Sequence, residues 1–206
     1  MDNFDSKFWD ERFSPEEYIY GTSPNKFFRE QIDKLTPGKI LLVGEGEGRN
    51  AVYAAKNGWR VDAVDYSSVA RDKALRLAKI SGVSIKYDVQ KIQSFVPVTN
   101  FYDTAALIFV HLNPFERKAL HWKIIDALAP KGIVIFEVYE KDQFGKTSGG
   151  PQNLEMLYSL DEIKSDFAEL DTVLLKKENI ILDEGDKHTG EASIIRYVGK
   201  KKSSTE

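Results

Sequence analysis

The sequence predicts an α/β domain with a seven-stranded, mostly parallel sheet, helices on both of its faces, and a C-terminal antiparallel hairpin. Apolar segments rich in β-branched residues alternate with segments of helical periodicity, a pattern typical of parallel strands covered on both faces. Towards the C-terminus, two long segments alternate apolar and polar residues instead, as in an antiparallel pair. No repeat or low-complexity linker indicates a second domain, so residues 1–206 are predicted to form one domain.

The core of this domain is predicted at 36–199. Its first five strands are expected at 39–43, 60–64, 83–87, 103–110 and 132–139. Helices are expected between them at 49–57, 68–80 and 114–129. Ser67 is suited to cap the second helix, and Asn113 followed by Pro114 is a typical start for the third.

Two extensions flank the first five strands. Residues 1–35 are rich in aromatic residues, continue into a helix from about Asn25, and are predicted to form a cover. Near the other end, Ser159 and Glu162 have capping-box spacing and open a helix to about residue 169. Strands are expected at 172–183 and 191–199, and residues 200–206 are expected to be a solvated tail.

Composition excludes several classes of function. The formal net charge is −3, and no clustered basic excess predicts a nucleic-acid partner, so a small-molecule partner is expected. The absence of cysteine excludes disulfides and thiolate metal sites, and the three histidines lack ligand spacing, so no metal is predicted. The N-terminus resembles no export signal, and no apolar stretch approaches the roughly 20 residues that span a bilayer. A cytoplasmic protein without membrane contact is therefore expected.

The clearest motif is the glycine-rich turn Gly44-Glu45-Gly46-Glu47-Gly48, directly after the first strand. Alternate glycines let the backbone turn sharply and approach a ligand, and the next helix offers free amides at its start. Asp65 ends the second strand, 21 residues after Gly44, where a carboxylate can accept hydrogen bonds from a ribose diol. Asp88, near the third strand, is suited to bind an adenine amino group or is a plain turn residue.

The spacing also favours one adenosine cofactor over another. A dinucleotide site has the spacing G-x-G-x-x-G, which from Gly44 requires the third glycine at position 49. In this sequence the third glycine is Gly48, and position 49 is Arg49. Without a pyrophosphate to hold, the turn suits S-adenosylmethionine, whose moiety beyond the ribose is a sulfonium amino acid.

These motifs resemble those of class I S-adenosylmethionine-dependent methyltransferases, in particular the bacterial group similar to tellurite-resistance and thiopurine methyltransferases. The resemblance is carried by five segments, at 9–13, 20–25, 44–50, 63–67 and 128–132. It implies a Rossmann-like fold and transfer of a methyl group to a small soluble acceptor. It also implies cofactor-binding roles for Tyr20, Asn25, Gly44, Glu45, Gly46, Gly48, Asn50, Asp65, Tyr66, Ser67, Asp88, Val89, Phe109, Val110 and His111.

One position departs from the family pattern. Most members have an acidic residue two positions before the first glycine, where this sequence has Leu42. We hypothesise that Glu45 supplies the replacement carboxylate for the cofactor's amino group. The alternative is that Glu45 is a surface residue of the loop.

Two residues are candidates for catalysis. His111 follows the fourth strand, where the reactive methyl is expected, and its ordinary pKa suits a general base; the alternative is a packing or capping role. Tyr139, at the end of the fifth strand, faces the same pocket or is a sheet-edge aromatic residue. His121 and His188 are expected to be structural or exposed, and the glycine-rich segment 145–151 is expected to fold over substrate.

Two other functions stay open. Position 42 lacks an acid, and His111 has a packing or capping role as the alternative to a general base. Both points are compatible with a catalytically silent protein that binds S-adenosylmethionine. A nicotinamide-dependent oxidoreductase is a weaker alternative, because the turn lacks the dinucleotide spacing.

Overall fold

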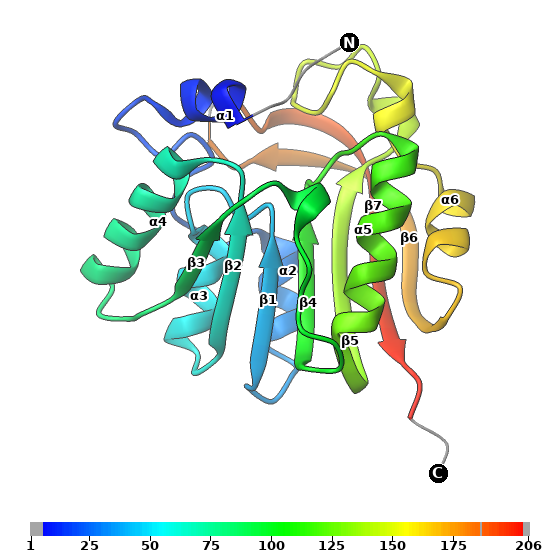
Figure 1. Ribbon diagram of the computed structural model, residues 1–206. Coiled ribbons are helices and arrows are strands. Elements are labelled where there is room, and N and C mark those ends of the chain that lie inside the picture. The colour runs from blue at the N-terminus through cyan, green and yellow to red at the C-terminus, as the bar shows by residue number, and fades with distance from the viewer. Residues whose placement is uncertain (1–5, 186, 204–206) are drawn as a thin grey trace.

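The computed structural model describes residues 6–185 and 187–203, which form a central twisted sheet with helices on both faces (Figure 1). The sheet has seven strands in the order β3-β2-β1-β4-β5-β7-β6. β1–β5 run parallel and β7 is antiparallel to both β5 and β6, which confirms the predicted fold. The strands are β1 (Lys39–Val43), β2 (Arg60–Asp65), β3 (Lys86–Val89), β4 (Tyr102–Ile108), β5 (Leu128–Tyr139), β6 (Leu170–Asp183) and β7 (Thr189–Lys201).

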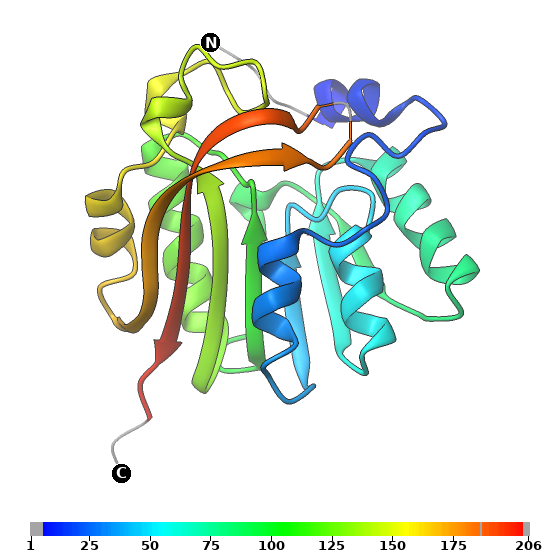
Figure 2. The ribbon, with the colours of Figure 1, turned by 180° about the vertical axis from the view of Figure 1, so that it is seen from behind.

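Alternate residues of each strand pack against opposite helical layers. On one face, Ile40 and Leu42 of β1 pack in a core with residues of α2, α3 and α4. On the other face, Leu41 and Val43 share a core with residues of α5 and α6. In Figure 2, which shows the molecule from behind, α2 and α3 lie in front of the sheet. The helices are α1 (Ser6–Phe13), α2 (Lys26–Ile32), α3 (Arg49–Lys56), α4 (Ser68–Ile80), α5 (Pro114–Ala127) and α6 (Leu160–Asp166), with short 3-10 turns η1 (Ile92–Ser94), η2 (Lys141–Gln143) and η3 (Leu154–Met156).

Most predicted helix starts are confirmed by their caps. Asn25 accepts a hydrogen bond from the backbone of Phe28 at the start of α2, and Ser67 caps α4 through the backbone of Ala70. Ser159 and Glu162 form the reciprocal capping box of α6. These side chains satisfy amides that the first turn of a helix leaves unpaired.

Several predicted boundaries are wrong, including the end of β4, which lies at Ile108 rather than 110. β3 covers 86–89 rather than 83–87, because Gly82 adopts a left-handed φ of 70° and the following residues connect rather than pair. α5 ends at Ala127, and β5 begins at Leu128 instead of 132, where a register irregularity accommodates Pro130. α6 ends at Asp166, short of 169.

The predicted tail also needs a correction. β7 continues through Lys201, and Lys200 pairs with Ile133. The Lys201 ammonium donates hydrogen bonds to the backbone oxygens of Ile125 and Leu128 and to Asn100 Oδ1. This cation therefore satisfies carbonyls that the end of α5 leaves free. Residues 200 and 201, predicted as part of the tail, belong to β7 instead.

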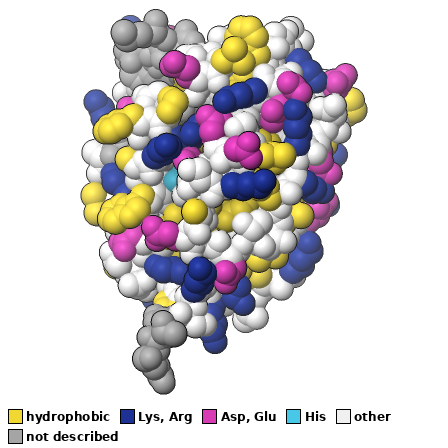
Figure 3. Space-filling model, turned by 90° about the vertical axis from the view of Figure 1, so that its right-hand side faces the viewer, with side chains coloured by type: hydrophobic (Ala, Val, Ile, Leu, Met, Phe, Trp, Pro, Cys, Tyr) yellow, Lys and Arg dark blue, Asp and Glu magenta, His cyan; other side chains and the backbone are white. Residues whose placement is uncertain are grey.

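One edge strand of the sheet is β3, and the other is β6, which pairs only with β7 among the described strands. Its side chains form ion pairs, such as Lys176 with Glu178 and Lys177 with Asp142. On the face that Figure 3 shows, positive and negative side chains are interspersed. Charged side chains along an edge disfavour pairing with another chain.

Candidate functional site

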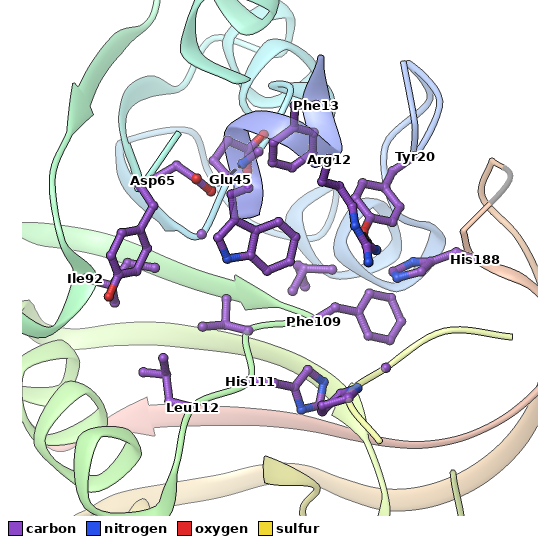
Figure 4. A pocket seen from close by; sticks show the side chains of 18 of the residues that line it. Arg12, Phe13, Tyr20, Glu45, Asp65, Ile92, Phe109, His111, Leu112 and His188 are labelled. Carbon is purple, nitrogen blue, oxygen red and sulfur yellow. Dashed lines mark hydrogen bonds between the residues drawn. The ribbon is translucent and has the colours of Figure 1, made fainter. Parts of the chain in front are cut away.

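A cavity of about 190 Å³ lies at the carboxyl edge of the parallel strands. Its base is the turn from β1 to α3 together with the segment that follows β4. Residues of α1, Tyr20, and His188 from the β6–β7 hairpin complete its walls (Figure 4). Parallel α/β sheets commonly bind ligands at this edge, because loops from several strands meet there.

The glycine-rich turn adopts the conformation that its sequence predicts. Gly44 and Gly46 have φ angles of 66° and 62°, which side-chain-bearing residues rarely adopt. A Cβ at Gly44 would lie 2.7 Å from Val110 Cγ2, so a larger residue there would displace the segment after β4. Gly48 does not line the cavity; it starts α3 with φ of 89° and packs against Ala74 of α4.

Asp65, at the end of β2, holds this turn in place. Its Oδ2 accepts a hydrogen bond of 2.9 Å from the Gly46 amide, and its Oδ1 accepts one of 3.0 Å from the Ser67 amide. Burial raises the pKa of Asp65, while these hydrogen bonds favour the carboxylate. The buried carboxylate therefore joins the two loops at the cavity, at the position that the sequence predicts for ribose binding.

Glu45 is buried beside the same turn and lines the cavity. Its Oε1 accepts a hydrogen bond of 2.7 Å from the Ala51 amide in the first turn of α3. Burial raises the pKa of Glu45 to about 8, against hydrogen bonds and the Arg49 charge that lower it. Glu45 is thus buried and is not a surface residue of the loop, which corrects that alternative. It brings a carboxyl group to the cavity, whereas Leu42 has none.

A buried ion pair anchors the N-terminal segment over the cavity. Lys73 Nζ of α4 lies 2.5 Å from Glu47 Oε1 and donates to the backbone oxygens of Pro15 and Glu17 at 2.8 and 2.6 Å. The Glu47 carboxylate also accepts a hydrogen bond of 3.4 Å from the Tyr20 amide. One lysine therefore ties the connection between α1 and α2 to the glycine-rich turn.

A second polar network ties the same segment to the C-terminal hairpin. Arg49 of α3 donates to the Tyr20 backbone oxygen at 3.1 Å and to Glu184 Oε2 at 2.8 Å. Asn25 Nδ2 donates to Glu137 Oε1 at 2.6 Å and to Glu184 Oε1 at 3.0 Å. Asn25 is buried and does not line the cavity, so it supports the walls.

Aromatic rings form the end of the cavity farthest from Asp65 (Figure 4). The His188 ring lies 4.5 Å from the Tyr20 ring and 4.6 Å from the Phe109 ring, between centroids. The Phe109 ring lies 4.6 Å from that of Tyr139. Phe109 follows β4 with φ of 57°, a strained conformation of the kind found at functional sites.

His111 lines the cavity, but both of its ring nitrogens have protein partners. Nδ1 donates to the Met156 backbone oxygen at 2.8 Å, which makes Nε2 the acceptor of the Tyr139 amide at 3.3 Å. Burial lowers the pKa of His111 to about 4. The hydrogen bonds position the loop that carries Met156, and they disfavour a role of His111 as general base.

Tyr139 lies beneath the glycine-rich loop that follows β5. Its hydroxyl donates to the Ser148 backbone oxygen at 3.4 Å, and burial raises its pKa. A Cβ at Gly149 would lie 2.3 Å from the Tyr139 hydroxyl, and one at Gly150 would lie 2.8 Å from its ring. The loop therefore approaches the ring through residues that lack side chains.

The structure brings most of the predicted site residues together, but not all. Those that line the cavity are Tyr20, Gly44, Glu45, Gly46, Asn50, Asp65, Tyr66, Phe109, Val110, His111 and Tyr139. Those that do not are Asn25, Gly48, Ser67, Asp88 and Val89. Asp88 is half-exposed and lies 3.4 Å from Lys86 Nζ, and Val89 is exposed.

Several lining residues were missed by sequence reasoning, among them His188 and Arg12. His188, expected to be structural or exposed, is buried with its ring in the cavity wall. Arg12 lines the cavity from α1. No local spacing in the sequence indicates either role, because both depend on how distant segments fold over the sheet.

Across residues 6–185 and 187–203, no group of three or more His, Cys, Asp or Glu residues is arranged to hold a metal. In the same ranges, no helix is long and apolar enough to cross a membrane.

Comparisons with known proteins agree with this geometry. Residues 40–132 match a sequence family described as a methyltransferase domain. No curated protein sequence matches the chain. Solved structures similar to the chain include one reported for the conversion of a disulfide bond into a thioacetal group during echinomycin biosynthesis, with 13% identity, a TM-score of 0.78, and coverage of 98% of this chain and 92% of that one.

Two further structures have the same fold. TehB from Haemophilus influenzae is 14% identical, with a TM-score of 0.72 over 96% of this chain and 67% of that one. The N-methyltransferase NodS from Bradyrhizobium japonicum, solved in complex with S-adenosyl-L-homocysteine, is 13% identical, with a TM-score of 0.70 over 95% of this chain and 97% of that one. At these identities the likeness shows the fold. Residues 40–132 thus match a methyltransferase domain, and the family match and the fold together point to S-adenosylmethionine as the cofactor.

Proposed function

We propose that the protein transfers a methyl group from S-adenosylmethionine to a small soluble acceptor bound in this cavity. The observation that carries the proposal is the hydrogen bond from the Gly46 amide to buried Asp65, which shapes the glycine-rich turn into one wall of the cavity. A backbone wall without side chains and a carboxylate at the end of β2 suit an adenosine-linked ligand without phosphates.

The cavity lining suggests how the cofactor is held. We propose that Gly44 and Gly46 contact its methionine portion and that Asp65 accepts hydrogen bonds from its ribose. The Glu45 carboxyl group faces the same cavity, and we propose that it binds the cofactor's amino group in place of an acid at Leu42. If Glu45→Gln leaves cofactor affinity within twofold, this assignment of Glu45 is wrong.

We also propose how the protein supports the ribose site and contacts the adenine of the cofactor. Ser67 holds the end of Asp65 through its amide, so it is proposed to act on the ribose site indirectly. Asp88 and Val89 lie at the end of β3, next to β2, and are proposed to contact the adenine. Because neither lines the cavity, this contact requires the adenine to extend past Tyr66 towards β3.

The chemistry needs little more than accurate placement. When bound, S-adenosylmethionine supplies a methyl group on a positively charged sulfur. The residues after β4, with Tyr20 and Tyr139, form the walls that hold an acceptor in line with that methyl. Orientation of two reactants in this way accounts for up to roughly 7–11 kcal/mol of barrier lowering in well-oriented systems.

A proton acceptor is needed only where the acceptor atom carries a proton. His111 is a poor choice, since both of its nitrogens are already bonded. His188 is better placed: its ring lies in the cavity wall, and its Nδ1 faces Glu184 Oε2 at 3.7 Å. We propose that His188 takes the proton, with Glu184 orienting its ring, while His111 and Tyr139 position the loops.

We also propose a family group and a cellular location for the protein. The front motifs and the shared fold with TehB support membership of the group similar to tellurite-resistance methyltransferases. A cytoplasmic location is proposed from the chain's lack of cysteine, which suits a reducing compartment.

Methyl transfer from radiolabelled S-adenosylmethionine to a panel of small thiols, phenols, amines and metalloid oxyanions tests the function. Label should pass to at least one acceptor, and His188→Asn should slow transfer to protonated acceptors about 100-fold or more. The matched control is His121→Asn, since His121 lies in α5 against Asp166 and away from the cavity. Cofactor binding without transfer to any acceptor would instead indicate a catalytically silent binding protein.

A further inference from the structure

Arg12 is a cation in the cavity wall, and no carboxylate among the described residues matches its charge. Its Nη1 donates a hydrogen bond of 3.3 Å to the Tyr20 hydroxyl, and its guanidinium lies 5.1 Å and 5.8 Å from the ring centroids of Phe8 and Trp9. Within residues 6–185 and 187–203, no acidic side chain forms an ion pair with it. A guanidinium has five N–H donors, so most of those of Arg12 have no acceptor among the residues that the structure describes.

Among the described residues, the fully buried lysine and arginine side chains are all paired with carboxylates. Arg49, which lines the same cavity, is paired with Glu184, and Lys73 is paired with Glu47. Arg117 and Arg196 each contact two carboxylates. Against this background, the partly buried Arg12 is arranged as a site for an anion rather than as part of a structural ion pair.

The surroundings of Arg12 indicate which end of the cavity it serves. In Figure 4 its guanidinium points towards Tyr20 and His188, and Asp65 lies on the opposite side. The walls near it are aromatic, since the ring of Tyr20 contacts that of His188, which in turn contacts Phe109. The rings of Phe8 and Trp9 pack against the guanidinium and restrict its orientation. Little conformational freedom is therefore lost when the guanidinium binds a planar anion.

We propose that Arg12 binds a carboxylate or similar oxyanion on the methyl acceptor, so that the acceptor is a small aromatic molecule with an anionic group. This inference rests on the proposed function, because it assumes that the aromatic end of the cavity holds the acceptor. The positive charge on the cofactor's sulfur also attracts a negatively charged acceptor.

The test uses two probes of equal size that differ in charge: phenylacetate and phenylacetamide. Their dissociation constants are measured by ligand-observed NMR, with and without saturating S-adenosylhomocysteine. The wild-type protein should bind phenylacetate about tenfold more tightly than phenylacetamide, because charge-assisted hydrogen bonds are stronger than neutral ones. Equal affinity for the two probes would overturn the inference without the need for any variant.

A variant pair then assigns the preference to Arg12. Arg12→Gln should reduce the ratio of the two affinities to within twofold, whereas Arg60→Gln, which removes an exposed charge at the start of β2, should preserve it. Survival of the ratio in Arg12→Gln would show that Arg12 is not the site. A tenfold loss of S-adenosylhomocysteine affinity with an unchanged ratio would assign Arg12 to the cofactor's carboxylate and also overturn the inference.

The same titrations separate this inference from the proposed function. If wild-type protein does not bind S-adenosylhomocysteine, the proposed function fails. The ratio measured without S-adenosylhomocysteine still decides whether Arg12 selects an anion.

Discussion

Glu184 Oε2 accepts a hydrogen bond of 2.8 Å from the Arg49 guanidinium, although 135 residues separate the two in the chain. The other oxygen of Glu184 accepts from Asn25 Nδ2 at 3.0 Å. One carboxylate therefore joins the end of the β6–β7 hairpin, the first turn of α3, and the start of α2. The hairpin and α3 line the cavity, and Asn25 supports its walls, so the shape of the cavity depends on this junction.

Glu184→Ala should lower the free energy of unfolding by about 3 kcal/mol, because it leaves the buried charge of Arg49 without its partner. Both side chains are less than a tenth exposed. Urea unfolding monitored by circular dichroism measures the change. Glu191→Ala is the control: Glu191 pairs with Lys146 at the surface, and exposed pairs contribute about 1 kcal/mol or less. Equal losses in the two variants would contradict the role given to Glu184.

Lys73→Met should release the segment between α1 and α2, because it removes the cation that holds Glu47 and two backbone oxygens of that segment. Limited trypsin digestion should cleave near residues 12–26 faster than in the wild-type protein. Lys79→Met, which removes an exposed lysine from the same helix, should leave the rate unchanged. Adding Glu47→Gln to Lys73→Met should restore part of the lost stability, and a purely additive double variant would argue against the pair.

Glu45 should make the protein less stable as the pH rises. The pKa of Glu45 is about 8 in the folded protein against 4.5 as the ordinary value, so the folded state binds more protons between these two pH values. The free energy of unfolding then falls by at most about 1.4 kcal/mol for each pH unit across this window. Glu45→Gln should remove this part of the slope between pH 5 and 8, and an identical slope in the variant would show that Glu45 titrates normally.

Gly150→Ala should raise the acceptor KM, because the added Cβ would lie 2.8 Å from the Tyr139 ring and displace the loop or the ring. Gly145→Ala is the matched control. Gly145 also has a positive φ, of 82°, but a Cβ there meets no atom within 4 Å. It therefore carries the backbone strain without the contact. Steady-state methyl transfer compares the two variants, and equal changes in KM would mean that strain alone accounts for the effect.

The order of elements was predictable because hydrophobic periodicity and capping signals are local. β1 was predicted at 39–43 and is found there, and Ser67 caps α4 as expected. The start of β5 was not predictable from local signals. Leu128 leaves the helix and pairs with Tyr102 across a register irregularity, so its conformation depends on a neighbouring strand.

The site was predictable only where its residues are close to strand ends. Asp65 and the glycine-rich turn meet because parallel neighbouring strands end at the same edge. His188 and Arg12 reach the cavity from opposite ends of the chain, through the hairpin and α1, and no spacing in the sequence encodes that approach. The bonds at both nitrogens of His111 are likewise set by loop packing.

Isothermal titration with S-adenosylhomocysteine measures directly whether the cavity binds the cofactor. The wild-type protein should bind with a micromolar dissociation constant, and Asp65→Asn should weaken binding at least about tenfold, since a carboxylate that accepts hydrogen bonds is lost. Asp72→Asn, an exposed position on α4, should bind like the wild-type protein. Absence of binding to the wild-type protein, or full affinity in Asp65→Asn, would contradict the account of the cavity as an S-adenosylmethionine site.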